Sequence, residues 1–256
     1  MPRVRLIARL DVKAPNLIKG VHLEGLRKIG NPNDYARRYY EAGIDELLYI
    51  DAVASLYQRN NLLDIVEKTT RNVFVPITVG GGLRSIEDIR QALRAGADKV
   101  ALNTQAVKRP AFVREAAEVF GRQCIVLSVA AKRHASGWEA LTDGGREHSG
   151  LDVLKWIKQC EALGAGEILL TSVDKEGTRK GFDIELIRTV NANATVPVIA
   201  SGGMGRVEHL VDLARAAGPS AIAMADFLHF ERMTLANLRT SLRDAGIDIR
   251  RVEASE

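Results

Sequence analysis

The sequence predicts a single α/β barrel of the (βα)8 kind, in which eight parallel strands close into a ring surrounded by helices. Three observations lead to this fold. The chain has 256 residues, close to the about 250 that such barrels commonly need. Short β-rich runs alternate along it with amphipathic helical patterns, and its two halves repeat one another. We therefore expect one domain over residues 1–256, built from half-barrels at about 1–120 and 121–245.

Each expected strand is a short apolar run bounded by polar or glycine-rich turns. Polar caps mark the helix starts. Ser85, for example, precedes a helical pattern and has Asp88 three residues later, close to a capping box. In chain order the eight runs read VRLIARLDV, ELLYID, VPITVGG, DKVALN, CIVLSV, EILLTS, VPVIAS and SAIAMA.

The internal repeat relates the second half of the chain to the first. EAGIDELLYIDAVAS matches ALGAGEILLTSVDKE, and ITVGGGLRS matches VIASGGMGR, so that Gly82 aligns with Gly203, 121 positions later. In this alignment Asp11, at the end of the first strand, falls opposite Ala130. The repeat thus predicts a second aspartate that this chain does not have.

Composition argues against several classes of function. No apolar stretch approaches the roughly 20 residues of a membrane span. The N-terminal MPRVRLIARLDVK alternates charged with apolar residues, unlike a signal peptide, so we expect a soluble cytoplasmic protein. The net charge of +4 comes from interleaved basic and acidic residues, which gives nucleic-acid binding no support. Cys124 and Cys160 stand apart and no histidine has a metal-ligand spacing, so we expect reduced thiols, no metal and no cofactor.

Two glycine-rich segments, VGGGLRS and SGGMGR, each follow an expected strand and precede a helix. Glycine lets a backbone approach a phosphate closely, and a helix N-terminus offers free N–H groups. Glycine is also common at tight β–α turns, so either segment alone leaves both interpretations open. Because the repeat relates them, together they predict a ligand with a phosphate at each end.

Asp11 ends the first strand, and barrel enzymes place their functional groups at that end of the strands. Its carboxylate could exchange protons with a substrate, or could form a structural ion pair with Lys13 or Lys19. Asp51 ends the second strand in the same way, and for it we favour a role in local hydrogen bonding.

Two connections are longer than a tight β–α turn, at residues 13–32 and 132–150. Both follow strands and therefore lie on the catalytic face, where we expect them to act as lids. His22 and His148 lie in these connections, and we favour a solvated position for both over contact with substrate.

The opposite face of the barrel carries charged residues of both signs at the beginnings of four strands. Two bases and two acids there could close a ring of ion pairs across the barrel. Charges on this face normally contribute to stability. The four residues are Arg5, Glu46, Lys99 and Glu167.

Taken together, the motifs resemble those of one family over nearly the whole chain. LDVK, IKG, GIDELLYID, ITVGGG, GADKVALNT, GAGEILLTS, DKEGT, VIASGG and the late HF resemble the cyclase (synthase) subunit of imidazole glycerol phosphate synthase. The resemblance implies a barrel that receives ammonia from a glutaminase subunit on its bottom face and uses it at the top. It assigns glutaminase docking to Tyr39 and Asp98. It also assigns a gate on the ammonia path to Arg5, Glu46, Lys99 and Glu167.

The same resemblance implies the site residues. Of the family's two catalytic aspartates, Asp11 is present, while the other is Ala130, whose methyl group cannot shuttle a proton. Asp226 stands where the family has a serine beside the second phosphate, and Gly144 replaces another serine. A carboxylate about 5 Å from a phosphate is repelled by on the order of 3 kcal/mol per unit charge, against at most about 2 kcal/mol from a helix N-terminus. Phosphate and substrate contacts are assigned to Lys19, Gly81, Gly82, Asn103, Thr104, Asp174, Gly177, Gly202, Gly203 and Asp226.

Residues 9–66 resemble still more closely a branch of this family associated with glycosyl amidation. In that branch the barrel and its glutaminase serve an ATP-dependent amidotransferase that converts an acetamido group of a bacterial surface sugar to an acetamidino group. This role needs the ammonia gate, which the chain keeps, and does not need the catalytic aspartate that Ala130 replaces. We therefore expect an ammonia-conducting barrel without cyclase activity of its own, which binds a glutaminase and a phosphorylated small molecule.

Two alternatives stay open. A histidine-pathway cyclase would convert the phosphoribulosyl-formimino-AICAR phosphate intermediate and ammonia to imidazole glycerol phosphate and AICAR. Asp11 and Lys19 support it, whereas Ala130 and Asp226 oppose it; an engineered origin of Ala130 would not account for Asp226 or Gly144. An unrelated sugar-phosphate isomerase barrel leaves the charged ring at the bottom unexplained.

Overall fold

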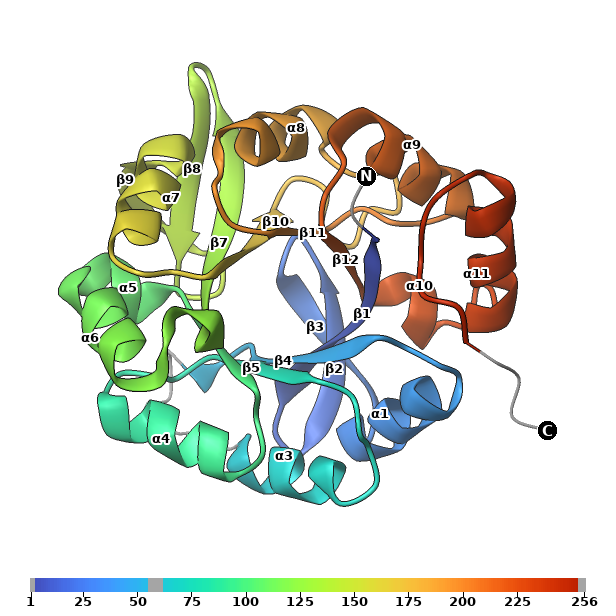
Figure 1. Ribbon diagram of the computed structural model, residues 1–256, viewed down its shortest axis with the longest axis horizontal. Coiled ribbons are helices and arrows are strands. Elements are labelled where there is room, and N and C mark those ends of the chain that lie inside the picture. Colours follow the sequence, from blue (N-terminus) through green and yellow to red (C-terminus); the bar gives the residue numbers. More distant parts are fainter. Residues whose placement is uncertain (1–2, 55–61, 253–256) are drawn as a thin grey trace.

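Eight parallel strands form a closed ring, which confirms the predicted (βα)8 TIM barrel (Figure 1). This computed structural model describes residues 3–54 and 62–252; residues 55–61, part of the stretch with the finer resemblance, lie outside them. Each barrel strand pairs in parallel with the next, and the first closes the ring with the last, Arg5 opposite Ala221. The barrel strands are β1 (Arg5–Lys13), β4 (Glu46–Asp51), β5 (Ile77–Gly80), β6 (Lys99–Leu102), β7 (Ile125–His134), β10 (Glu167–Ser172), β11 (Val198–Ser201) and β12 (Ala221–Met224).

Helices surround the ring on its outside in Figure 1. Local signals fix their starts: the side chain of Asn31 accepts a hydrogen bond from the Asn33 N–H before α1, and Ser85 and Asp88 form the predicted capping box of α4. The helices are α1 (Pro32–Glu41), α3 (Leu63–Thr70), α4 (Ile86–Arg94), α5 (Thr104–Lys108), α6 (Ala111–Phe120), the short 3-10 helix η1 (Arg122–Cys124), α7 (Val153–Ala162), α8 (Ile184–Asn193), α9 (Val207–Ala217), α10 (Asp226–His229) and α11 (Leu235–Asp244).

The alternation of side chains along each strand builds two separate cores. On β1, Leu6 and Ala8 join the outer core between strands and helices, while Ile7 points into the barrel. The polar residues Arg5 and Arg9 share the inward parity of Ile7, one on each side of it. An apolar layer inside the barrel therefore separates a polar cluster at the bottom from one at the top. This layer consists of Ile7, Leu48, Ala101, Val126, Leu169, Ile199, Ala221 and Ala223.

The two long connections predicted as lids are antiparallel hairpins that extend the sheet. The first comprises β2 (Asn16–Val21) and β3 (Glu24–Gly30), and the second comprises the end of β7 with β8 (Gly137–Thr142) and β9 (Glu147–Asp152). Figure 1 shows the β7–β8 hairpin projecting beyond the ring of helices. No helix in the part of the chain that the structure describes is long and apolar enough to cross a membrane.

Candidate functional site

A cavity of ≈ 160 Å³ opens at the C-terminal ends of the barrel strands, and we call it the upper pocket. Leu23 and Leu26 of the first hairpin line its outer part. The pocket brings together most of the predicted site at the face where barrel enzymes hold their substrates. The predicted residues that line it are Asp11, Lys19, Gly81, Gly82, Asn103, Thr104, Ala130 and Gly144.

One end of the upper pocket combines a glycine turn with basic side chains. Gly81 has a φ of +97°, and a Cβ added there would lie 2.5 Å from the backbone oxygen of Asp51, so only glycine fits this turn. Gly82 follows it with a φ of +74°. Arg84 and Lys108 line the same pocket and add positive charge that the sequence analysis did not single out.

Asn103 and Thr104 connect this end of the pocket to the second hairpin. The side-chain amide of Asn103 donates to the Leu141 carbonyl at 3.2 Å, and the Thr104 hydroxyl accepts from the Asp143 N–H at 3.0 Å. Gly144 lies in the same turn, with a φ of +72°. The turn is thus fixed against the barrel rather than free to swing.

Asp11 has a partner that the sequence analysis did not predict. Its Oδ1 accepts from the Nε of Arg9 at 2.9 Å, rather than pairing with Lys13 or Lys19. Both side chains are buried, with 6% and 7% of Arg9 and Asp11 exposed. Burial alone would lower the pKa of Arg9, but the negative charges of Asp11 and Glu176 raise it above its ordinary value.

The guanidinium of Arg9 also crosses the interior of the barrel. Its Nη1 donates to Thr171 on β10 at 2.9 Å and to Ser201 on β11 at 3.2 Å. Its Nη2 has no hydrogen-bond partner among the described residues, and Arg9 lines the upper pocket. The pocket floor therefore presents an ion pair with a free N–H group.

Ala130 lies on the other side of this floor. It is paired in register with Thr171, and it packs in a small apolar cluster with Leu141 and Val173. β1 and β7 are the first and fifth strands of the ring, so Asp11 and Ala130 face the same pocket from separate strands. At position 130, the wall of the pocket opposite Asp11 therefore carries a methyl group and no proton donor.

Lys19 and Asp174 are each paired within the protein. Lys19 forms a buried ion pair with Glu176, from the loop after β10. Asp174 accepts from Lys132 at 3.0 Å and from the Arg133 N–H at 2.8 Å. Burial alone would raise the pKa of Asp174, but the hydrogen bonds from these two donors lower it below its ordinary value. Asp174 is not among the pocket-lining residues, so within the described chain its contacts tie the loop to the second hairpin.

The predicted second phosphate end is a separate hollow of only ≈ 20 Å³. Gly177, Gly202 and Gly203 line it, together with Asp226. Asp226 is 7% exposed and pairs with two arginines, Arg179 and Arg232. The predicted repulsion assumed an isolated carboxylate, and that assumption is wrong because two guanidinium groups balance the charge.

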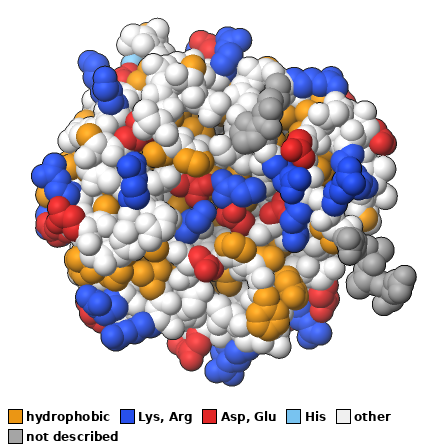
Figure 2. Space-filling view, in the orientation of Figure 1, with side chains coloured by type: hydrophobic (Ala, Val, Ile, Leu, Met, Phe, Trp, Pro, Cys, Tyr) orange, Lys and Arg blue, Asp and Glu red, His pale blue; other side chains and the backbone are white. Residues whose placement is uncertain are grey.

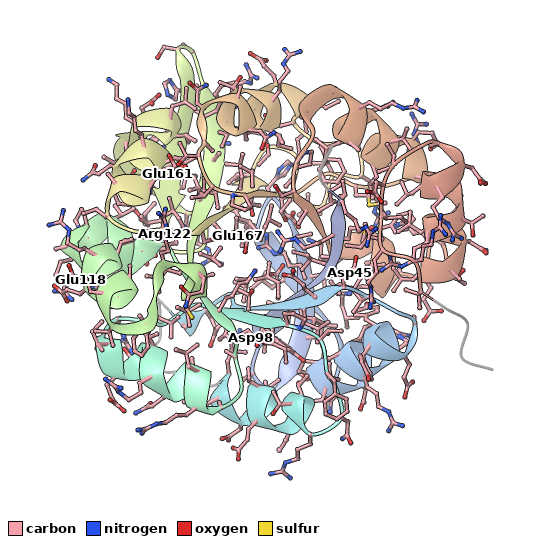
Figure 3. All side chains as sticks on the ribbon, viewed as in Figure 1. Asp45, Asp98, Glu118, Arg122, Glu161 and Glu167 are labelled. Carbon is pink, nitrogen blue, oxygen red and sulfur yellow. The ribbon has the colours of Figure 1, made fainter. Side chains whose placement is uncertain are left out.

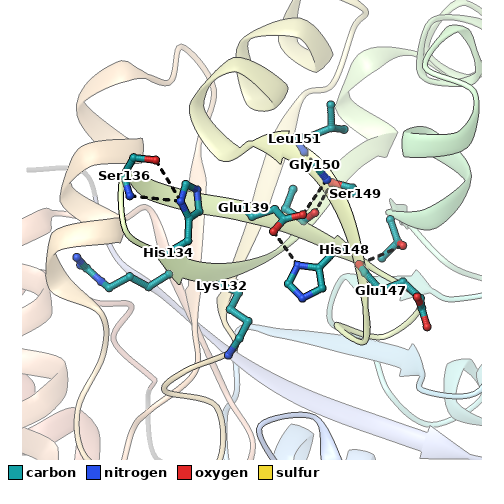
Figure 4. A network of polar contacts seen from close by, with 12 residues as sticks. Lys132, His134, Ser136, Glu139, Glu147, His148, Ser149, Gly150 and Leu151 are labelled. Atoms are coloured by element: carbon teal, nitrogen blue, oxygen red, sulfur yellow. Dashed lines mark hydrogen bonds and ion pairs between the residues drawn. The ribbon is translucent and has the colours of Figure 1, made fainter.

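Asp51 and the two hairpin histidines make local contacts. The Oδ1 of Asp51 accepts from the Val53 N–H at 3.0 Å, and burial raises the pKa of Asp51. The Nδ1 of His22 lies 2.9 Å from the Val173 carbonyl oxygen. His148 pairs with Glu139 at 2.7 Å on the exposed side of the second hairpin, as Figure 4 shows. Asp51 also lines the upper pocket, whereas His22 and His148 line neither hollow.

The four charged residues at the strand beginnings form a closed ring, as their positions predicted. Arg5 pairs with both Glu46 and Glu167, and Lys99 lies 2.7 Å from Glu167 and 3.8 Å from Glu46. Burial alone would lower the pKa of Arg5, but the two glutamates raise it. Figure 2 shows charged side chains of both signs gathered at the centre of this face, and Figure 3 shows Glu167 near that centre.

The two residues assigned to docking differ in position. Asp98 is exposed beside the ring (Figure 3), and its Oδ2 accepts from the Ile77 N–H at 2.8 Å. Tyr39 is 4% exposed, and its hydroxyl shares a 2.6 Å hydrogen bond with the Nδ1 of His229. Because its side chain is inside the fold, Tyr39 offers a partner no surface, and we leave it out of the docking face.

Comparison with known proteins places the chain in a family. A family model described as "Histidine biosynthesis protein" matches residues 5–234. The chain belongs to this histidine biosynthesis family. A Legionella pneumophila protein named imidazole glycerol phosphate synthase subunit HisF is 63% identical over 209 residues, which cover 81% of this chain and 99% of that protein. A protein of the same name from Corynebacterium glutamicum (strain R) is 47% identical over 255 residues, which cover 97% and 98%.

The names of these relatives bear on the two functions that the sequence analysis left open, sugar amidation and the histidine-pathway cyclase. Both relatives are named for imidazole glycerol phosphate synthase, and neither name refers to sugar amidation. The histidine-pathway alternative is therefore better supported than the sugar-amidation reading that the sequence analysis preferred.

Besides Arg84 and Lys108, sequence reasoning assigned no role at the site to Arg9, Glu176, Arg179 and Arg232. Arg9 had a usable signal, because a strand with period two places it on the same face as Asp11. Glu176 belongs to the DKEGT motif, whereas Arg179 and Arg232 had no signal, since each lies in a loop or helix end whose side-chain direction depends on the tertiary structure.

Proposed function

We propose that this chain is the barrel subunit of an ammonia-using synthase of the imidazole glycerol phosphate synthase kind. Its upper pocket binds a phosphorylated ligand, and its bottom face receives ammonia from a glutaminase subunit. One observation carries the proposal: a single barrel has a glycine-lined basic pocket at one end and a closed ring of Arg5, Glu46, Lys99 and Glu167 at the other.

The interior between the two ends supports passage of a small neutral molecule. The inner layer is apolar and includes the alanines Ala101, Ala221 and Ala223. An ammonium ion would lose its hydration there at high cost, whereas uncharged ammonia would lose much less. We expect the ring to open at the Lys99–Glu46 contact, which at 3.8 Å is the longest of its four ion pairs.

The bottom face also supports a protein partner. Phe74, in the turn before β5, is 74% exposed and packs edge-on against Tyr40, with ring centroids 6.0 Å apart. Exposed aromatic residues are frequent anchors of protein interfaces. Figure 2 shows hydrophobic side chains grouped toward the lower rim of this face, around the charged centre. We assign Phe74, Tyr40 and Asp98 to the glutaminase docking face.

Two reactions fit this architecture, and different observations favour them. The relatives favour ring closure in histidine biosynthesis. Ala130 and the Arg9–Asp11 pair favour the second candidate, delivery of ammonia to a sugar amidotransferase, because general acid–base catalysis contributes about 10²- to 10⁴-fold and half of the expected acid–base pair is missing. If the chain closes the ring, it does so slowly.

The deciding experiment measures consumption of the histidine-pathway intermediate by the purified barrel, with ammonium and with glutamine plus its glutaminase. We expect turnover at or below about 1% of that of a two-aspartate relative, and only partial recovery in Ala130→Asp. Rapid turnover by the natural sequence would establish ring closure and remove the second candidate. If the barrel neither binds a glutaminase nor stimulates its hydrolysis of glutamine, the proposed function is wrong.

A further inference from the structure

The carboxylate of Asp226 is held as a ligand phosphate would be held. Arg179 approaches it as a fork, with Nε 2.9 Å from Oδ1 and Nη2 3.1 Å from Oδ2. Arg232 adds a third contact, with its Nε 2.9 Å from Oδ1. Forked guanidinium contacts of this kind are the ones arginine makes with phosphates as well as carboxylates.

Tight loop packing places Arg179 above Asp226. A Cβ added to Gly203 would lie 2.1 Å from the Gly181 oxygen, and one added to Gly205 would lie 2.4 Å from the Arg179 oxygen. The Gly181 N–H donates to the Gly203 oxygen at 2.9 Å. The glycines of SGGMGR therefore allow the loop after β10 to pack on the loop after β11. The sequence analysis had instead expected them to let the backbone approach a phosphate.

Little room is left beside these residues. The hollow that Asp226 lines measures ≈ 20 Å³, about the space of one water molecule. Lys19, which also lines it, is already paired with Glu176. By contrast the upper pocket measures ≈ 160 Å³ and is lined by the glycine turn and by Arg84 and Lys108.

We propose that Asp226 is an internal substitute for a second ligand phosphate and restricts this protein to ligands with one phosphate. The ligand's phosphate binds at the end formed by Gly81, Gly82 and Thr104, and its other end is uncharged. The inference rests on the proposed function only in taking the upper pocket as the ligand site. Asp226 is thus a specificity-determining residue, since it fills the space that a second phosphate needs and pairs with the cations that would bind it.

Replacing Asp226 should create the missing site. In the natural protein the trio of Asp226, Arg179 and Arg232 has a net charge of +1, and in Asp226→Ser the two arginines alone carry +2 beside the space of the lost carboxylate. Two guanidinium groups that no longer pair with a carboxylate attract a phosphate dianion, although both are partly exposed to solvent.

The test is equilibrium dialysis with inorganic phosphate. We expect one phosphate per chain for the natural protein and two for Asp226→Ser, with the added site at least about tenfold tighter than any second binding by the natural protein. The triple variant Asp226→Ser, Arg179→Met, Arg232→Met should return to one. Two phosphates on the natural protein, or a folded Asp226→Ser variant that binds no more phosphate than the natural protein, would overturn the proposal.

Folding and the first site are checked separately. If thermal melting shows that Asp226→Ser is unfolded, Asp226→Asn keeps the shape and removes the charge, and it must then bind phosphate more tightly than the natural protein does for the proposal to stand. If the natural protein binds no phosphate at all, the upper pocket of the proposed function is in question. A gain of one phosphate in Asp226→Ser would still support the specificity role.

Discussion

His229 should make the protein sensitive to mild acid. It is 4% exposed, and burial lowers the pKa of His229 from an ordinary 6.5 to about 4. The charges that act on it have opposite effects: Asp11 and Asp226 favour the protonated form, while Lys19 and Arg38 oppose it. Burial of a neutral imidazole is therefore the dominant cause.

The direction in which stability changes with pH follows from the lowered pKa of His229. As the pH falls below about 6.5, the unfolded chain takes up a proton at this residue while the folded protein does not, so stability decreases. The loss is complete below a pH of about 4. The difference between 6.5 and 4 amounts to about 3.4 kcal/mol, of which about 2 kcal/mol is lost by pH 5. That is a large fraction of the roughly 5–15 kcal/mol that stabilises a typical domain.

Urea unfolding at several pH values between 7.5 and 4.5 measures this loss. Ion-paired carboxylates also titrate in acid, so the natural protein is compared with His229→Asn, which keeps a polar group near Tyr39 and cannot titrate there. The free-energy difference between the two should shrink by about 2 kcal/mol between pH 7.5 and 5. Tyr39→Phe, the matched control, loses about 1 kcal/mol for the missing hydrogen bond at every pH. Parallel curves for the natural protein and His229→Asn would refute the argument.

Three further outcomes are expected. Lys99→Ala and Glu46→Ala should change glutamine-dependent product formation much more than ammonium-dependent formation, with a cost for Lys99→Ala of about 1 kcal/mol in unfolding experiments; equal effects on both ammonia sources would end the gate assignment. Arg9→Met should lower the free energy of unfolding by about 3–5 kcal/mol because it leaves a buried Asp11 unpaired, and adding Asp11→Asn should recover most of that loss. An unchanged free energy of unfolding in Arg9→Met would contradict this. Phe74→Lys should weaken glutaminase binding at least about tenfold in a titration while the melting temperature stays within about 2 °C, because the ring is mostly exposed.

The sequence was sufficient for the barrel because its signals are local or repeated. The run ELLYID coincides with β4 (Glu46–Asp51), and each of the eight apolar runs overlaps a strand of the ring, although β1 and β7 extend beyond theirs. The charged ring could also be predicted, because parallel strands bring their first residues together on one face. Glu46 and Glu167 begin β4 and β10, and Arg5 contacts both across the barrel.

The partners of the site residues could not be predicted in the same way. Lys19 was a plausible partner for Asp11 by proximity in sequence, yet it pairs with Glu176, 157 positions away. Asp226 was taken as an unpaired charge because Arg179 comes from another loop, which reaches it through a left-handed backbone at φ +63°. Such contacts depend on how loops pack on the finished barrel, and no local pattern encodes that packing.

The replacement at Ala130 is one of several linked changes on the top face. Three carboxylates that line its two hollows already have cations: Asp11 has Arg9, Glu176 has Lys19, and Asp226 has two arginines. A proton exchanged through Asp11 would first have to break a buried ion pair that Thr171 and Ser201 help to hold. An aspartate at position 130 would restore one carboxylate but would leave Arg9 and the filled phosphate end as they are. Ala130→Asp alone should therefore remain a poor cyclase, and a variant that also removes Arg9 and replaces Asp226 with serine should come closer to cyclase activity, with Gly144 still in place of the family's serine.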